Sequence, residues 1–195
     1  MSEVESDDDD VRRAVVLDYL AHGLSQGRRR YQGSPAGYAM TLDDFTLYQV
    51  AFDEDARITI GKRVVVEPPS ARDRIEECHE ISYEDLSSGA QSELEYVVHD
   101  VIEDEEERFV EFFNEAQPIS LRLHQLNLLP GIGKKLRNNI LDERKRKPFE
   151  SFEDLEERVS GLHDPAEVLA KRILEELRDE DLKYRRFVGY EPTDQ

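Results

Sequence analysis

Two glycines stand between two helix-like segments of this chain, in the run Leu128-Leu129-Pro130-Gly131-Ile132-Gly133-Lys134-Lys135. An apolar run leads up to them, and beyond them Leu136, Ile140 and Leu141 recur at helical spacing as far as Arg146. The pattern predicts a tight turn that opens a new helix. Glycine lets the backbone lie close to a partner, and the unpaired N–H groups at a helix start attract anions. The turn is therefore a candidate seat for a nucleic-acid phosphate, with an ordinary helix-helix turn as the alternative.

Basic residues gather directly after the glycines. The window from Lys134 to Lys147 holds seven basic residues and two acidic ones, although the whole chain carries a net charge of −19. Four of the seven lysines of the chain fall in this window. Because neutralisation of phosphates dominates nucleic-acid affinity, this concentration favours phosphate binding over an ordinary turn. The candidate binding residues here are Gly131, Gly133, Lys134, Lys135, Arg144, Lys145 and Lys147.

The stretch from Leu123 to Val159 resembles a helix-hairpin-helix domain, since it holds an LPGIG hairpin, a following helix that ends in arginine, and a PFxSxxDL segment. Over roughly residues 11 to 190 the chain resembles an archaeal family of uncharacterised proteins, in which an OB-like β-domain precedes a helix-hairpin-helix domain. The resemblance implies that the hairpin amides at Gly131, Ile132, Gly133 and Lys134 grip backbone phosphates without reading sequence. It also implies a monovalent cation held by hairpin carbonyls, and no other cofactor is expected.

One residue departs from the helix-hairpin-helix pattern. Where DNA-repair hairpins commonly have alanine four residues after the second glycine, this chain has Arg137. The arginine must either point outward or widen the helix pair. A degenerate second hairpin around Val159-Ser160-Gly161-Leu162 is a further expectation from the same resemblance.

The N-terminal half is rich in β-branched and aromatic runs that turn residues separate, among them Val15–Leu20, Phe45–Phe52, Ile58–Ile60 and Val64–Val66. They predict four or five short strands in a small antiparallel barrel that resembles an OB-fold. The loop between the first two strands commonly touches oligonucleotides in OB-folds. Here that loop carries the candidate nucleic-acid-binding residues Arg28, Arg29, Arg30 and Tyr31, and a solvated loop is the alternative.

These patterns divide the chain into four parts. Residues 1–10 are expected to be a disordered acidic tail, and residues 11–88 to be the OB-like domain. Residues 89–118 form a connecting amphipathic helix, whose apolar stripe runs from Gln91 to Ala116 and is interrupted only by Glu105. Residues 119–190 complete the α+β fold as the helix-hairpin-helix domain. Within it, helices are expected over Phe152–Val159, after the cap Ser151, and over Pro165–Arg178, after the cap Asp164.

Catalysis and metal binding find little support in the sequence. The five histidines lack ligand spacing, and the residues suggest no nucleophile–base arrangement, so we expect no enzyme. The single Cys78 excludes an internal disulfide and a cysteine-cluster zinc site, and is expected in the core or a strand. With no apolar stretch of about 20 residues and no signal-peptide pattern, we expect a cytoplasmic protein without a membrane partner.

The acidic composition bears on environment and function. Acidic residues outnumber basic ones by 45 to 26, and lysine is scarce, as in proteins of salt-accumulating cells, so a halophilic source is expected. The function expected is non-catalytic nucleic-acid binding through backbone phosphates, with RNA favoured over DNA. The RNA preference follows from the family resemblance. Genes of that family often lie beside ribosomal RNA modification and translation genes, which implies ribosome-assembly or translation proteins as partners. The alternative is a protein-interaction scaffold without nucleic-acid contact.

Overall fold

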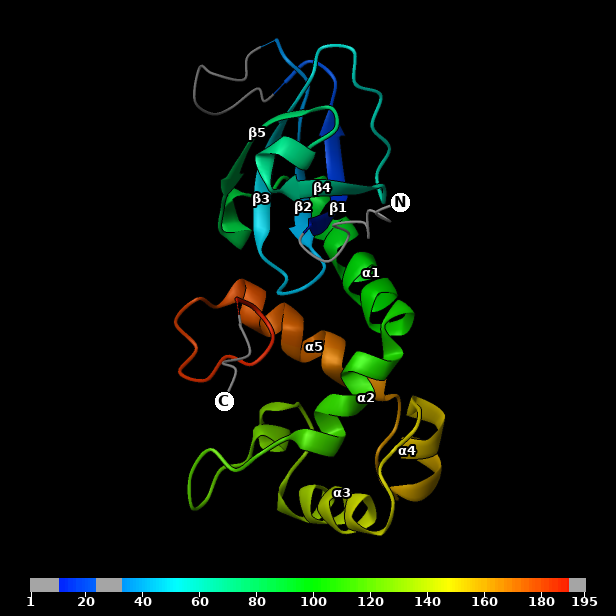
Figure 1. Cartoon of the computed structure of the whole chain (residues 1–195). Helices are drawn as coiled ribbons and strands as arrows, with labels where there is room; N and C mark the ends of the chain where they lie inside the picture. The colour runs from blue at the N-terminus through cyan, green and yellow to red at the C-terminus, as the bar shows by residue number, and fades with distance from the viewer. Residues whose placement is uncertain (1–10, 24–32, 190–195) are drawn as a thin grey trace, which may run out of the picture. The chain divides into compact units, whose positions relative to one another are not determined.

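The computed structural model describes residues 11–23 and 33–189 of the chain (Figure 1). The candidate residues Arg28, Arg29, Arg30 and Tyr31 and the expected acidic tail lie outside this range. The described residues form two compact units. The sheet unit runs to Val97 and also takes in Val188 and Gly189, and the helical unit runs from Val98 to Phe187. The α+β class predicted from the sequence is confirmed.

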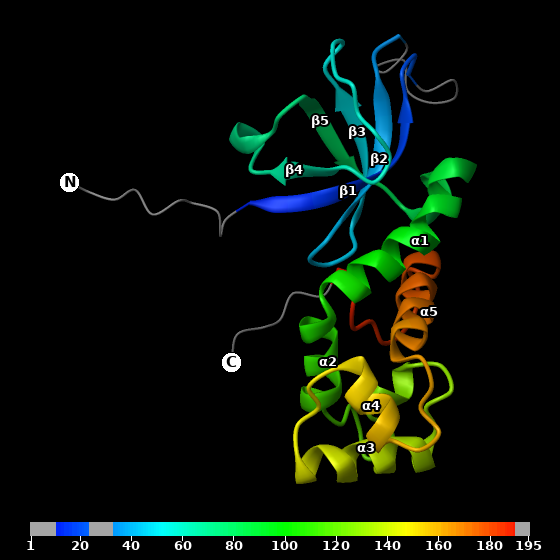
Figure 2. The ribbon, with the colours of Figure 1, turned by 90° about the vertical axis from the view of Figure 1, so that its right-hand side faces the viewer.

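The sheet unit is built on five antiparallel strands in the order β4-β1-β2-β3-β5. This order leaves β4 and β5 at the two edges, and the strands twist and curl into a half-barrel (Figure 2). The strands are β1 (Arg12–Leu20), β2 (Ala36–Thr41), β3 (Leu47–Phe52), β4 (Arg63–Glu67) and β5 (Ile75–Glu80), with short 3-10 turns η2 (Pro69–Ala71) and η3 (Tyr83–Asp85) beside β5.

Apolar side chains from the strands and from the loop between β3 and β4 make one core. They are Ala14, Val16, Ala39, Val50, Phe52, Ala56, Ile58, Val64, Val66 and Ile75. Where β1 pairs with β2, the register shifts between Val16 and Asp18, and the two backbones approach closely. A Cβ on Gly37 would lie 2.2 Å from the carbonyl oxygen of Asp18, so β2 requires glycine there.

Three strand assignments differ from the sequence prediction, and the first is β2, which none of the predicted runs covers. Residues Ile58–Ile60 were expected as a strand, but they lie in a loop, where Ile58 is buried in the core and Ile60 is half exposed. The fifth strand is instead β5, which pairs with β3 at the edge. Cys78 lies half-buried in β5, in agreement with its expected place in a strand.

The helical unit contains the remaining helices around an apolar centre. They are α1 (Ser88–Asp104), which begins in the sheet unit, α2 (Glu106–Glu115), the 3-10 turn η4 (Gln125–Leu128), α3 (Lys134–Arg146), α4 (Phe152–Arg158) and α5 (Pro165–Arg178). Fully buried side chains of this unit include Phe109, Phe113, Leu126, Leu129, Ile140, Leu155 and Ile173. The expected helix starts after Gly133, Ser151 and Asp164 are confirmed.

The expected single helix from Gln91 to Ala116 is wrong, because the chain leaves helical geometry at Glu105. This residue has φ −111° and ψ 37°, and α1 ends and α2 begins on either side of it. The break is local: the Glu105 N–H still donates to the Val101 carbonyl at 3.0 Å. The Glu105 carboxylate then pairs with Arg108 in the first turn of α2 at 2.6 Å.

The segment after α5 packs back onto the helical unit. Glu176 is fully buried, and its carboxylate accepts the backbone N–H groups of Arg186 and Phe187 at 2.9 Å each. The Phe187 ring lies 5.1 Å from the Phe112 ring. These contacts hold the segment against the helical unit. Among the helices of the described residues, none combines the length and apolarity that crossing a membrane requires.

Candidate nucleic-acid interface

Residues 129–133 form a tight turn before α3, which we call the glycine turn. The Ile132 N–H donates to the Leu129 carbonyl at 3.2 Å, and both side chains are buried. Gly131 has φ +81°, in the left-handed region that favours glycine. The turn is thus anchored by two apolar side chains, while its glycines remain on the surface.

The start of α3 is open beside this turn. Gly133 is the N-cap and has no side chain to cap the helix. The bond from the Arg137 N–H to the Gly133 carbonyl, at 2.9 Å, closes the first turn of α3, so the preceding amides lack intrahelical partners. A Cβ on Gly131 or Gly133 would meet no described atom within 4 Å. This open surface, with amides and the positive end of a helix dipole, suits an anion.

The side chain of Asn127 fixes the glycine turn against its neighbours. Its amide donates to the Ile132 carbonyl at 3.0 Å, and its carbonyl oxygen accepts the His124 N–H at 3.1 Å. Arg137 donates to the same oxygen at 3.1 Å. Arg137 therefore lies along the surface against Asn127 and does not enter between helices, which decides between the two expectations for it. No sequence pattern signals this role of Asn127.

His124 stabilises η4, the 3-10 turn that precedes the glycine turn. It is buried, and its Nδ1 accepts the Leu126 N–H at 3.1 Å, which caps η4. Burial, with the positive charges of Arg144 and Arg137 nearby, lowers the pKa of His124 below its ordinary value. Both effects keep the imidazole neutral, as its role as an acceptor requires.

The predicted basic residues lie at the two ends of α3. Lys134 and Lys135 are exposed at its start, and Lys145 and Lys147 are exposed at its end. Lys145 follows Lys134 by eleven positions, which is about 16 Å along the helix axis. Lys147 also pairs with Glu150 at 3.2 Å. The structure thus brings two pairs of lysines to one helix, far enough apart to meet different phosphates.

Arg144 has a different environment from its lysine neighbours. Its Nη1 donates to the carbonyls of Phe113 and Ala116, at 3.1 and 2.9 Å, where α2 ends. Burial lowers the pKa of Arg144 from its ordinary value. These bonds give the residue a packing role, as a cap on the last carbonyls of α2, and a contact with phosphate stays a prediction.

The cation implied by the resemblance also stays a prediction. Among the carbonyls of the glycine turn, those of Leu129 and Ile132 each already accept one hydrogen bond, from Ile132 and from Asn127. Each oxygen retains a second lone pair. Among the described residues, no group of three or more His, Cys, Asp or Glu side chains is arranged to hold a metal ion.

A second turn at residues 159–162 repeats the geometry of the glycine turn. The Leu162 N–H donates to the Val159 carbonyl at 3.2 Å, both side chains are buried, and Gly161 has φ +94°. The helix that follows is closed, however. The Asp164 carboxylate caps α5 by accepting the Glu167 N–H at 3.1 Å. The chain's own negative charge thus occupies the place where an anion would bind.

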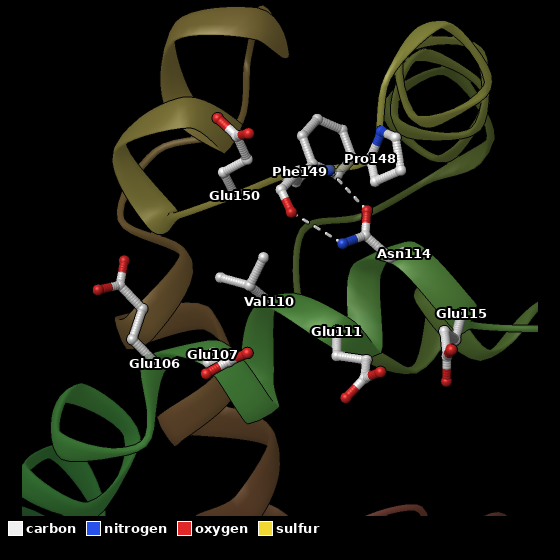
Figure 3. Close-up of a pocket in the computed structure, with 9 residues that line it drawn as sticks. All are labelled: Glu106, Glu107, Val110, Glu111, Asn114, Glu115, Pro148, Phe149 and Glu150. Carbon is white, nitrogen blue, oxygen red and sulfur yellow. Dashed lines mark hydrogen bonds between the residues drawn. The ribbon is translucent and has the colours of Figure 1, made fainter.

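A concavity of about 730 Å³ in the helical unit is lined by acidic side chains, in contrast to the basic surface of α3 (Figure 3). Its apolar wall contains Val110 and Phe149, and the amide of Asn114 makes two hydrogen bonds to the backbone of Phe149, at 2.9 and 2.7 Å. Five glutamates line it: Glu106, Glu107, Glu111, Glu115 and Glu150. Such a surface repels phosphate.

Together, the fold and this interface define an α+β protein with a curled antiparallel sheet in one unit and a glycine turn opening a basic helix in the other. The chain belongs to the DUF655 family, described as proteins of unknown function, whose family model matches residues 10–189. It is 40% identical over 187 residues to the uncharacterised protein MJ0038 of Methanocaldococcus jannaschii, across 91% of this chain and 79% of that protein.

A solved structure supports the same relationship. The crystal structure of Af1531 from Archaeoglobus fulgidus matches with a TM-score of 0.82 and 35% identity, covering 91% of this chain and 99% of that chain. Both relatives come from archaea, so the archaeal family expected from the sequence is confirmed.

Proposed function

We propose that the protein binds nucleic acid without catalysis, by seating a backbone phosphate at the glycine turn and the open start of α3. The observation that carries the proposal is the contrast between two turns of the same geometry, of which one leads into an uncapped helix and the other into a helix closed by Asp164. An open helix start with a glycine N-cap is suited to close backbone approach by an anion.

Charge supports a nucleic acid as the source of that phosphate. The exposed pair Lys134 and Lys135 adjoins the turn, and Lys145 and Lys147 extend the positive surface along α3. A free phosphate ion would require only Lys134 and Lys135, so the second pair of lysines favours a ligand that carries several phosphates. In this proposal η4, the glycine turn and α3 form a helix-hairpin-helix element, and the sheet unit is an OB-like domain whose loop Arg28–Tyr31 adds contacts.

RNA is the proposed target over DNA, with ribosome assembly or translation as the setting. This part of the proposal rests on the family resemblance of the sequence. Because the contacts are to phosphates, we expect affinity to vary little with base sequence and to fall steeply with salt. Comparing one hairpin RNA with a DNA duplex of equal charge measures the preference.

The decisive substitution is Gly133→Ala in the full chain. The position has φ −84° and open space around a Cβ, so alanine fits the folded protein but places a methyl group where the phosphate must sit. We expect affinity for a fluorescent polynucleotide to fall about tenfold or more, as loss of a charge-assisted hydrogen bond implies. His163→Ala, which changes the corresponding exposed position after the second turn, is the matched control.

A second pair of variants tests the lysines. Lys145→Gln should weaken binding equally for different base sequences and lower the slope of log affinity against log salt by about one. Lys171→Gln, at an exposed lysine of α5, should leave both unchanged. If Gly133→Ala and Lys145→Gln both bind like the unmodified protein, the proposal fails and the scaffold alternative replaces it.

A further inference from the structure

The loop between α2 and η4 presents a leucine to solvent. Leu121 has a relative exposure of 106%, the highest among the three large hydrophobic side chains that are exposed in the described residues. The other two are Ile60 at 51% and Tyr96 at 70%. A single exposed aliphatic side chain is ordinary on a protein surface. Leu121 differs from such a residue in the hydrogen-bonded structure of the loop that carries it.

Residues 118–124, which we call the leucine loop, are closed by hydrogen bonds. A β-bridge joins Pro118 to His124, and the N–H groups of Ile119 and Ser120 donate to the Leu123 carbonyl at 2.8 and 3.0 Å. Inside the loop the Ser120 hydroxyl oxygen accepts the N–H of Leu123 at 3.1 Å. These bonds hold the tip in place, so Leu121 is not free to fold back and bury itself.

Hydrogen bonds join the base of the leucine loop to the glycine turn and to α3. Asn127 accepts the His124 N–H and donates to the Ile132 carbonyl, which links the loop to the glycine turn. On the other side of the loop, Arg144 of α3 donates to the Ala116 carbonyl. In Figure 1 the loop projects away from the helices of its unit. Hydrogen bonds therefore connect the base of the loop to both the glycine turn and α3.

We propose that the leucine loop inserts Leu121 between bases of the nucleic acid whose phosphate sits at the glycine turn, while Arg122 contacts a neighbouring phosphate. The inference rests on the proposed function. Leucine is among the residues that proteins insert between base steps as apolar wedges. Arg122 is exposed directly beside it, and an arginine at the tip favours a phosphate-bearing partner over an apolar protein surface.

The chemistry of the partner follows from this pairing. A base step offers an apolar face to Leu121, and the flanking phosphates offer the charge that Arg122 requires. Unstacking is least costly at bulges, loops and ends, where the bases are already only partly stacked. The preferred ligand class is therefore structured RNA or DNA with an interrupted helix, over an uninterrupted duplex.

The experiment uses the full chain and an RNA hairpin with a bulge, in which the base beside the bulge is 2-aminopurine. This base becomes brighter when it is unstacked. We expect the unmodified protein to raise the fluorescence at saturation. Leu121→Ala should remove the rise and weaken binding about tenfold, as loss of a buried leucine contact implies. Arg122→Gln should keep the rise and lower the salt slope by about one.

The controls separate this inference from the proposed function. Ile60→Ala, at an exposed aliphatic residue of the sheet unit, should change neither the fluorescence nor the affinity. If Gly133→Ala weakens binding but Leu121→Ala preserves both affinity and the fluorescence rise, only the wedge is overturned. If the unmodified protein fails to bind the hairpin, the proposed function falls with it. Leu121→Ala that instead dissociates a dimer in sedimentation would overturn the wedge in favour of self-association.

Discussion

At the scale of single residues, His124 couples pH to the hydrogen bonding of η4. Its neutral imidazole accepts the Leu126 N–H and so caps η4, directly before the glycine turn. A protonated imidazole has no free lone pair for this bond. Burial and the nearby Arg144 and Arg137 lower the pKa of His124, so the folded protein holds the neutral form over a wider pH range than the unfolded chain does.

This shift predicts a loss of stability at mildly acid pH. Between the ordinary histidine pKa of about 6.5 and the lower folded value, the unfolded chain binds the proton more readily. The free energy of unfolding contributed by His124 is therefore complete above about pH 6.5 and declines as the pH falls. Urea unfolding followed by circular dichroism from pH 7.5 to 5 measures the decline. His124→Asn, which keeps a capping oxygen and does not titrate, should show a shallower decline, and equal slopes would refute the assignment.

Residue type alone did not predict which cations are available to a ligand. Arg144 and Lys145 are neighbours in the same basic window, yet Arg144 caps carbonyls of α2 while Lys145 is exposed. The difference arises from the direction in which each side chain leaves α3, which depends on how the helix packs against α2. Asn127 was missed for a similar reason, since an asparagine that bonds three separate segments has no distinctive spacing.

At the scale of elements, the contact between α3 and α2 predicts a stability difference between these two neighbours. Arg144→Gln should lower the free energy of unfolding of the helical unit by about 2 kcal/mol, because it removes charge-assisted hydrogen bonds from carbonyls at the end of α2. Lys145→Gln should stay within about 0.5 kcal/mol of the unmodified protein, as exposed substitutions usually do. Urea unfolding of both variants makes the comparison. A larger loss for Lys145→Gln would contradict the structure.

Helix starts were predictable where the sequence has a capping residue. Gly133, Ser151 and Asp164 are residues whose chemistry caps a helix, and each begins one as expected. The break falls at Glu105, the one interruption of the apolar stripe, but the stripe resumes at Phe109 with helical spacing, so the sequence was interpreted as one continuous helix. Only the backbone angles in the folded chain reveal that α1 and α2 are separate.

Burial on the sheet made β1 and β3 predictable but not β2, whose six residues are all buried although only Thr41 among them is β-branched. The runs around Val16 and Val50 are apolar because they fill the core between strands. Strand β5 escaped prediction because it lies at an edge and carries exposed residues, including Glu76 and Glu77. The apolar Ile58 suggested a strand, but a loop can bury an isoleucine equally well. Burial and strand pairing are thus separate properties that a short sequence pattern does not distinguish.

At the scale of the whole molecule, the charge of −19 predicts a dependence of stability on salt. Self-repulsion among carboxylates is screened over about 3 Å at 1 M salt and over about 10 Å at 0.1 M. The melting temperature should therefore climb as KCl is added. Chloride is the suitable salt, since sulfate strengthens apolar burial by itself. A melting temperature that is flat from low to molar KCl would reject the halophilic interpretation of the composition.

The pair of similar turns has a consequence for the valence of binding. Two open helix starts would make a bivalent clamp, which fixes the direction of a bound strand as well as its position. Because Asp164 closes α5, the helical unit offers a single such seat at the glycine turn. In the proposed complex the backbone amides therefore fix one phosphate, and the remaining phosphate contacts come from long lysine and arginine side chains. Such an arrangement accommodates curved and irregular strands that two fixed helix starts would exclude.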